Sequence, residues 1–317
     1  MYLSILIIAA ICAMTVSSFS AEVLRAGIIG ADTSHVTAFT ELLNSPKASG
    51  DLAGIKIVAA FPGGSADIPS SIDRVPGYVV KLKEMGVEIV DSVEALLPKV
   101  DVVLLESLDG RPHLQQAIPV LKARKPVFID KPLAGTLADA VEIYRLAREL
   151  NVPCFSSSAL RFSPGILGMR NDPRVGQVLG CEAFSPCSLE AHHPDLFWYG
   201  IHGVETLFTI MGAGCESVTR VQTKDCELVV GVWKDGRVGT FRGLREGKKD
   251  YGATVFGSKG IVPSGGFGGY QPLVVEIAKF FKTGTLPVSL EETLEIYAFM
   301  EAADESKRQG GRSVSIA

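Results

Sequence analysis

The fold of this 317-residue chain is decided by one stretch near its start, Val23-Leu24-Arg25-Ala26-Gly27-Ile28-Ile29-Gly30-Ala31-Asp32-Thr33-Ser34-His35. Its apolar half has the length of a short strand and ends at Gly30. Thr33 or Ser34 can then serve as the N-cap of a helix, because apolar side chains recur at helical spacing from Val36 onward. The stretch therefore predicts a strand, a tight turn and a helix.

The same alternation continues through the first half of the chain. Further apolar strands are predicted at residues 55–61, 87–90, 100–105, 127–129 and 152–155, with helical segments between them. Residues 100–105 are almost wholly apolar, as expected of a parallel strand that is buried on both faces. We therefore predict an α/β protein whose N-terminal domain is a doubly wound (Rossmann) parallel sheet, which binds ligands beyond the carboxyl ends of its strands.

The pattern changes after Arg161 and Phe162. Strands are predicted at residues 178–184, 218–223, 227–233, 238–242 and 253–256, and helices at 201–211, 273–281 and 291–307. Asp235-Gly236, between two of these strands, is a strong hairpin signal. We therefore expect a Rossmann domain at residues 21–160 and a C-terminal α+β domain with a mainly antiparallel sheet at residues 161–317.

Composition narrows the classes of partner. The chain has 31 Lys and Arg against 35 Asp and Glu, a formal net charge of −4, and no run of like charge. Nucleic-acid binding through phosphates usually requires a basic stripe, so no nucleic-acid partner is expected.

The first 21 residues contain no charged side chain. A continuous apolar run at residues 5–14 is followed by small residues, which is typical of a secretory signal peptide, with cleavage after Ser20 or Ala21. The run is shorter than a bilayer span, so we expect no lasting membrane span. We predict a signal peptide at residues 1–20 of the Sec type and an exported protein, periplasmic or secreted. The alternative is a membrane tether formed by an uncleaved signal anchor.

Five cysteines follow the predicted signal peptide, and none of them forms a C-x-x-C pair. An oxidising compartment allows one disulfide, either Cys181 with Cys187 or Cys215 with Cys226. The alternative is that all five are small core residues.

The order of motifs resembles the Gfo/Idh/MocA family, named for glucose–fructose oxidoreductase, inositol dehydrogenase and a rhizopine-catabolism protein. The motifs are Ala26-Gly27-Ile28-Ile29-Gly30, Glu106-Ser107 with His113, Asp130-Lys131-Pro132-Leu133-Ala134, Arg161-Phe162-Ser163-Pro164 and Gly257-Ser258-Lys259-Gly260. The resemblance implies NAD- or NADP-dependent oxidoreduction of a sugar or polyol. It also implies that the second domain binds the small-molecule substrate and often forms a homo-oligomer.

The residues that the resemblance assigns to cofactor binding follow strands of the first domain. They are Gly30, Asp32, Thr33, Ser34, Glu106, Ser107, His113, Asp130 and Lys131. Asp32 and His35 replace the second and third glycines of the dinucleotide fingerprint. A carboxylate beside a pyrophosphate is unfavourable unless it points away, so we expect weaker or differently posed dinucleotide binding, which Asp32→Gly should tighten. The segment after residue 61 supplies no acid for the ribose diol, and Asp67 is a distant substitute.

Two residues are implied as catalytic. Lys131 matches the lysine of the family's Glu-Lys-Pro motif, which binds a substrate hydroxyl and assists proton movement. His202 matches the family's catalytic histidine and could take the proton of a hydroxyl as hydride leaves its carbon. Trp198 stands where the family often has an orienting aspartate, and Asp195 or Glu205 is a candidate substitute.

The segment before His202 is rich in histidine and aromatic residues. We assign to substrate binding Arg161, His192, His193, Asp195, Trp198 and Tyr199. A metal site is an alternative for this segment, as is a polar loop with no ligand. Its spacing matches no standard zinc pattern, so no metal ligand is assigned.

The leading functional prediction is an exported NAD(P)-dependent oxidoreductase acting on CH–OH groups of a sugar, polyol or glycoside. The alternative is a non-redox carbohydrate-binding or lyase-like protein that kept the fold and lost dinucleotide binding, because a fold does not by itself determine a function.

Overall fold

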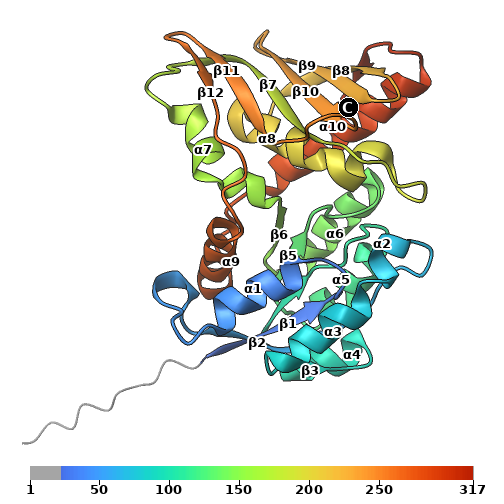
Figure 1. Cartoon of the computed structure of the whole chain (residues 1–317), viewed down its shortest axis with the longest axis vertical. Helices are drawn as coiled ribbons and strands as arrows, with labels where there is room; N and C mark the ends of the chain where they lie inside the picture. The colour runs from blue at the N-terminus through green and yellow to red at the C-terminus, as the bar shows by residue number, and fades with distance from the viewer. Residues whose placement is uncertain (1–22, 317) are drawn as a thin grey trace, which may run out of the picture.

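The computed structural model describes residues 23–316. The predicted signal peptide and its cleavage site lie outside the described residues. Two sheets stand one above the other in Figure 1, the N-terminal one below and the C-terminal one above.

The lower sheet has six parallel strands in the order β3-β2-β1-β4-β5-β6. The strands are β1 (Leu24–Ile29), β2 (Ile55–Phe61), β3 (Glu88–Ile89), β4 (Val102–Leu105), β5 (Val127–Asp130) and β6 (Cys154–Ser157). β4 is buried along its whole length, as its apolar sequence predicts. The strand order is that of a doubly wound sheet, which confirms the predicted fold class.

Helices cover both faces of this sheet. They are α1 (His35–Asn44), α2 (Pro69–Ile72), α3 (Val75–Glu84), α4 (Val93–Leu96), α5 (His113–Lys122) and α6 (Leu137–Glu149), with 3₁₀ turns at Gly50–Leu52 and Leu97–Lys99. Phe39 of α1 and Leu82 of α3 join one hydrophobic cluster. Val120 of α5 and Ile143 of α6 join the other. This placement on opposite faces is what the crossover connections of a parallel sheet require.

The upper sheet has seven strands in the order β12-β11-β7-β10-β9-β8-β13. The strands are β7 (Val178–Pro186), β8 (Cys215–Gln222), β9 (Cys226–Trp233), β10 (Val238–Leu244), β11 (Gly252–Gly257), β12 (Ile261–Pro263) and β13 (Val314–Ser315). Only the β7–β10 pair within it is parallel, so the sheet is mainly antiparallel, as predicted. Asp235 and Gly236 lie in the turn between β9 and β10.

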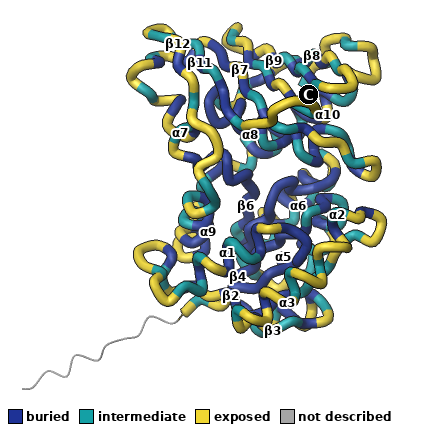
Figure 2. The backbone as a smooth tube through the Cα atoms, viewed as in Figure 1, coloured by how far each residue is buried: buried dark blue, intermediate teal, exposed yellow. Residues whose placement is uncertain are grey.

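The remaining elements connect the two sheets or lie between them. They are 3₁₀ turns at Ala159–Phe162 and Gly168–Asn171, α7 (Pro164–Leu167), a π-helical turn at Leu196–Gly200, α8 (Ile201–Met211), α9 (Gln271–Thr283) and α10 (Leu290–Arg308). Helices α8 and α10 pack beneath the upper sheet, and Figure 2 shows the buried backbone running through both sheets and the region where they meet.

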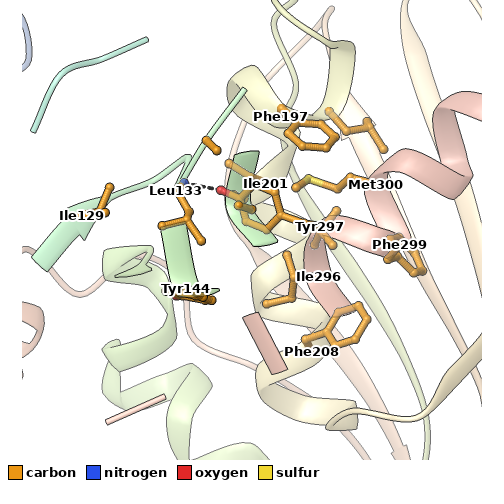
Figure 3. Packing of buried hydrophobic residues seen from close by; sticks show 14 of the residues in the cluster. Ile129, Leu133, Tyr144, Phe197, Ile201, Phe208, Ile296, Tyr297, Phe299 and Met300 are labelled. Atoms are coloured by element: carbon orange, nitrogen blue, oxygen red, sulfur yellow. Dashed lines mark hydrogen bonds between the residues drawn. The ribbon is translucent and has the colours of Figure 1, made fainter. Parts of the chain in front are cut away.

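One hydrophobic cluster continues from the first domain into the second. Tyr297, Phe299 and Met300 of α10 pack beside α8 (Figure 3). The hydroxyl oxygen of Tyr297 accepts a hydrogen bond from the backbone N–H of Leu133, just after β5. Packing and this hydrogen bond therefore fix α10 against the edge of the first sheet where ligands are expected.

Helix α9 returns to the first domain, although the sequence prediction assigned all of residues 161–317 to the second. Leu273, Val274 and Ile277 belong to the same cluster as the buried side chains of α1. The apolar face of α9 predicts a buried helix but carries no information about which domain buries it.

Within residues 23–316, Cys154, Cys181, Cys187 and Cys215 are buried free thiols, and Cys226 is free and half-buried. Both candidate disulfides are therefore unformed. No helix in this part of the chain has the length and hydropathy needed to cross a bilayer.

Candidate active site

A pocket opens where the carboxyl ends of the first sheet meet the second domain. It is lined by Thr33, Ser34, His35, Arg74, Leu108, Lys131, Ser158, Ala159, Leu160, Tyr199, His202, Tyr251, Phe267 and Tyr270. These residues come from the turn after β1, the ends of β5 and β6, the first turn of α8 and the segment before α9. The structure thus brings together Lys131 and His202, which are 71 residues apart in the chain (202 − 131).

The turn after β1 is tight. Gly30 has a φ of +93°, and a Cβ at this position would lie 2.4 Å from the backbone nitrogen of Ser107. Only glycine fits this conformation and this close approach. Thr33 and Ser34 follow at the start of α1 and line the pocket, as the cofactor assignment requires.

Asp32 does not point into the pocket. Its side chain is fully buried and accepts hydrogen bonds from the hydroxyl of Ser71 (2.5 Å) and the backbone N–H of Leu108 (2.9 Å). Burial raises the pKa of Asp32 by more than these hydrogen bonds lower it. The carboxylate therefore connects α2, the short helix that follows the loop after β2, to the loop after β4 instead of facing a phosphate.

The two loops are joined at a second place. Ser65 donates to Asp109 (2.6 Å), and the guanidinium of Arg111 binds both Asp109 and Asp67 (each 2.8 Å). Asp67, the distant substitute for a ribose-binding acid, is thus already paired with an arginine.

Lys131 is held in position from both sides of the sheet edge. Its backbone N–H donates to Asp130 Oδ1 (2.8 Å), and the next residues are anchored to α10 through Leu133 and Tyr297. The ammonium group lies 5.9 Å from the centroid of the Tyr199 ring, within cation–π range. The side chain is almost fully buried, so the charge is presented to the pocket and little of it to bulk water.

His202 lies in the first turn of α8. Its Nδ1 is 2.8 Å from Ser158 Oγ. Burial lowers its pKa well below the usual value, and the charges of Lys131 and His35 lower it further, against the opposing effect of Asp130. The imidazole is therefore neutral at physiological pH and able to accept a proton.

The proposed substitutes for the family's orienting aspartate do not contact His202. Glu205 accepts hydrogen bonds from Ser157, from the backbone N–H of Ser158 and from Arg161. Asp195 binds Arg220 and Lys307. Among residues 23–316, Ser158 is the hydrogen-bond partner of the His202 ring.

Three residues assigned to cofactor binding lie behind the pocket wall. His113 is fully buried between the carbonyl oxygens of Ser107 (2.9 Å) and Leu133 (3.2 Å), where it joins two loops. The hydroxyl of Ser107 donates to Gln116. Glu106 is fully buried, and neither of its carboxylate oxygens has a hydrogen-bond partner in the described part of the chain. Burial raises the pKa of Glu106 well above its usual value, and the nearby Asp130 and Asp32 carboxylates raise it further.

Of the residues assigned to substrate binding, Tyr199 lines the pocket and five do not. Arg161 is buried in ion pairs with Glu205 (2.7 Å) and Glu292 (2.6 Å). Asp195 is held in the second domain by Arg220 (2.8 Å), which is itself fully buried. These charged groups are engaged within the protein, and helical proximity in the sequence could not reveal their partners.

Of the remaining three, His192 and His193 precede the π-helical turn and Trp198 lies within it, and none of them lines the pocket. The His193 ring packs against Trp198 at 5.4 Å, and burial lowers the pKa of His193. His192 is half exposed and binds Glu190 (2.9 Å). The structure therefore turns this segment away from the pocket, and only Tyr199 faces it.

Several lining residues escaped the sequence prediction. Tyr251 donates to or accepts from Tyr199 (3.0 Å between the hydroxyl oxygens), and Phe267 and Tyr270 pack edge to face at 5.2 Å. Tyr270 directly precedes α9, and the return of α9 to the first domain places this side chain over His35. The sequence could not predict that these aromatic side chains line the pocket, because the position of Tyr270 depends on where α9 packs.

The residues present fit a nicotinamide dinucleotide at the pocket. The start of α1 presents Thr33 and Ser34 to the pocket, and the Asp32 carboxylate is turned inward, away from a bound phosphate. Among residues 23–316, no group of three or more His, Cys, Asp or Glu side chains is arranged to hold a metal ion.

These observations define a two-domain protein with a Rossmann sheet and a pocket at its ligand-binding edge. Residues 24–158 match the model of the Gfo/Idh/MocA family, described as an oxidoreductase family with an NAD-binding Rossmann fold. The N-terminal domain of the chain is thus similar to the NAD-binding domain of this family.

Comparison with known proteins supports this placement. A 1,5-anhydro-D-fructose reductase of Ensifer adhaerens is 34% identical over 108 residues, which is 32% of each chain. An inositol 2-dehydrogenase of Mycolicibacterium vanbaalenii is 29% identical over 147 residues, 46% of this chain and 37% of the relative. The matches thus span about a third of the length of these relatives.

The similarity in fold extends over both domains. The scyllo-inositol dehydrogenase of Lactobacillus casei, solved with NAD(H) and scyllo-inositol, superposes with a TM-score of 0.73 over 93% of this chain and 99% of its own, at 14% identity. At this identity the superposition establishes the shared fold.

Proposed function

We propose that the protein is an NAD(P)-dependent oxidoreductase that interconverts a CH–OH group and a carbonyl group of a sugar, polyol or glycoside. The observation that carries the proposal is the shared pocket of Lys131 and His202 at the carboxyl ends of the parallel strands. The family match and the sugar- and inositol-converting relatives support the same class of reaction.

The chain's own residues would divide the work as follows. Thr33, Ser34 and the start of α1 would hold the phosphates, because a helix N-terminus presents unsatisfied N–H groups and a partial positive charge. A nicotinamide bound there supplies the acceptor or donor of hydride. Lys131 would donate a hydrogen bond to the reacting hydroxyl and favour its ionisation.

His202 would receive a hydrogen bond from a neighbouring hydroxyl of the substrate. It is neutral and buried, so the lone pair of its Nε2 is available as an acceptor once Ser158 is bound to Nδ1. The Lys131 cation favours the alkoxide character that develops as hydride leaves the carbon.

The rest of the pocket suits a sugar-like substrate. Tyr199, Tyr251, Phe267 and Tyr270 present aromatic faces and hydroxyls, and Ser158 adds a further hydroxyl. Aromatic rings cover the apolar faces of a sugar ring while the hydroxyls bond to its polar edge.

The experiment is a titration of the purified protein with NAD⁺ and with NADP⁺ by calorimetry, followed by absorbance assays with myo-inositol, scyllo-inositol and 1,5-anhydro-D-fructose. Binding of one dinucleotide and substrate-dependent formation or consumption of its reduced form are expected. Binding of a polyol by protein that binds neither dinucleotide would contradict the proposal and support a non-redox role. The segment after β2 offers Asp67 as the acid for a ribose diol, and Asp67 is already paired with Arg111. The titration is therefore needed to decide between NAD and NADP.

We also propose export and self-association. The uncharged N-terminal segment supports export through a Sec-type signal. The outer face of the upper sheet carries exposed apolar side chains, including Leu179 and Val238, which supports pairing of two copies through this face.

A further inference from the structure

The pocket contains a second imidazole besides that of His202. His35 is the first residue of α1, at the position of the third glycine, and its side chain lines the pocket beside Lys131 and His202. Its ring is stacked on Phe39 with centroids 5.3 Å apart and meets the edge of Tyr270 at 4.7 Å. With a side chain only 9% exposed, the ring is held in one orientation by its neighbours.

A buried carboxylate fixes this ring further. The Nδ1 of His35 is 2.6 Å from Asp130 Oδ2, and the other carboxylate oxygen accepts the backbone N–H of Lys131. Burial acts to raise the pKa of Asp130, but the charge and hydrogen bond of His35 and the charge of Lys131 outweigh it, so the pKa lies below its usual value. The Asp130 carboxylate accepts the Nδ1 proton of His35 in both the protonated and the neutral ring, and in the neutral ring the lone pair then lies on Nε2. Among the described residues Nε2 has no hydrogen-bond partner.

His202 lacks such a carboxylate. Its partner is the neutral hydroxyl of Ser158, and the nearby cation Lys131 opposes the formation of an imidazolium. Trp198 occupies the position from which the family's aspartate orients this histidine, and its ring packs against His193. His202 is therefore well suited to accept a hydrogen bond and poorly suited to retain a proton.

We propose that His35, oriented by Asp130, is a catalytic acid–base residue of this pocket. The inference rests on the oxidoreductase function proposed above. In the oxidation direction the C–H bond of the substrate breaks and its electron pair leaves with the hydrogen as hydride, which the oxidised nicotinamide accepts. The O–H bond breaks and its proton passes to Nε2 of His35, while the carbon–oxygen bond becomes a carbonyl. The imidazolium, stabilised by Asp130, afterwards releases the proton to solvent.

The charged and titratable groups that surround this imidazole come from several elements. Asp130 and Lys131 lie at the end of β5, His202 in α8, Tyr270 before α9, and Arg74, Tyr199 and Tyr251 complete the pocket lining. Replacing one of them alters the field at the ring, so the test compares variants that keep its packing with variants that change its partner.

The first measurement needs neither substrate nor cofactor. In protein labelled with ¹⁵N-histidine, His35→Gln identifies the resonances of this ring by their loss. We expect the neutral ring to carry its proton on Nδ1, and Asp130→Asn to remove this tautomer preference, because the carboxylate that accepts the Nδ1 proton is lost. A neutral ring protonated on Nε2, or one whose tautomer is unchanged in Asp130→Asn, would overturn the proposal.

The second measurement is the pH dependence of turnover with the dinucleotide and polyol that the titration and assays under Proposed function identify. We expect His35→Gln and His35→Phe to lower kcat by about 10²–10⁴-fold and to abolish the acidic limb of the kcat/KM profile. His35→Phe keeps an aromatic ring against Phe39, so it separates loss of the nitrogen atoms from loss of packing. Added imidazole should restore activity in His35→Ala.

Asp130→Asn removes the carboxylate that orients the His35 ring and should therefore lower kcat and alter the pH profile. The matched control is Asp235→Asn in the turn between β9 and β10, which should leave the profile unchanged. A His35→Gln variant that binds dinucleotide normally and retains kcat and the pH profile would refute the role of His35 alone. Absence of dinucleotide binding in the unaltered protein would instead refute the proposed function, and with it this role.

Discussion

Replacing Asp32 tests whether this carboxylate belongs to the cofactor site or to the scaffold behind it. In Asp32→Ala the hydroxyl of Ser71 and the backbone N–H of Leu108 both lose their acceptor in a buried environment. Hydrogen bonds to a charged group contribute about 1.5–3 kcal/mol each, and part of this is offset because the carboxylate no longer has to be desolvated. We therefore expect a net loss of about 2–4 kcal/mol of stability.

Asp32→Asn is the matched variant. Its amide oxygen can still accept from Leu108, and its amide nitrogen can donate to the rotatable hydroxyl of Ser71, so a loss of only about 1 kcal/mol is expected. Urea unfolding followed by far-ultraviolet circular dichroism measures both changes, and limited proteolysis reports release of the loop after β2.

The glycine fingerprint predicts that Asp32→Gly tightens dinucleotide binding. The structure predicts that it does not. The carboxylate faces Ser71 and Leu108, so its removal relieves no repulsion in the pocket, and it frees the loops that border the cofactor site. Dinucleotide binding in Asp32→Gly should therefore be unchanged or weaker by calorimetry. Tighter binding together with undiminished stability would show that Asp32 opposes the pyrophosphate and would refute the reasoning.

Three further predictions concern Glu106, the pair Lys131 and His202, and the N-terminal segment. Burial raises the pKa of Glu106 well above its ordinary value of 4.5, so the native state retains a proton that the unfolded state loses. Stability should then fall as pH rises above this ordinary value, by up to about 1.4 kcal/mol per pH unit, and Glu106→Gln should remove that slope in urea unfolding at a series of pH values. Lys131→Ala and His202→Ala should each lower kcat by about 10²–10⁴-fold with little change in unfolding midpoint; an unchanged kcat in either would exclude that residue from the reaction. N-terminal sequencing of protein from its native host should begin just after Ser20 or Ala21, whereas a soluble protein that still carries Met1 would contradict export.

The first sheet was predictable because a strand that is buried on both faces consists of consecutive apolar residues, which are visible in the sequence. β2 coincides with its prediction, and β4 differs by two residues at its start. β6 begins at Cys154 instead of residue 152, where Pro153 lacks the N–H that a ladder would need. Strand position is a local property in these cases, and local composition is sufficient to predict it.

The position of α9 and the burial of charged side chains were not predictable in the same way. Arg220 lies on a strand of alternating pattern, yet it is fully buried in ion pairs with Asp195, Glu227 and Asp304. Such a network depends on residues more than 80 positions apart, including a carboxylate from α10. A sequence pattern gives the face on which a residue lies but does not identify its distant partner.

The candidate site was predictable only where a single motif carries its own position. Lys131 and His202 stand at the end of a strand and the start of a helix, and both element boundaries could be read locally. Arg161, by contrast, matches a motif at the domain junction but forms ion pairs with Glu205 and Glu292 and does not line the pocket. A motif match therefore predicted a pocket-lining residue at the boundary of a strand or helix, but not between two packed domains.

The two departures from the family's pattern concern one chemical requirement, a carboxylate that holds an imidazole. The departure at Trp198 removes the aspartate from the second domain, and the departure at His35 places an imidazole against Asp130 in the first domain. Considered separately, each substitution weakens the match to the family. Considered in the folded chain, the pocket retains one carboxylate-bound imidazole and one imidazole bound to a hydroxyl, and the charge of Lys131 lowers the pKa of both Asp130 and His202. The elements that carry these groups, β5, α1 and α8, belong to different domains, so relative movement of the domains would alter the distance between the two imidazoles while the His35–Asp130 pair, contained in the first domain, stays intact.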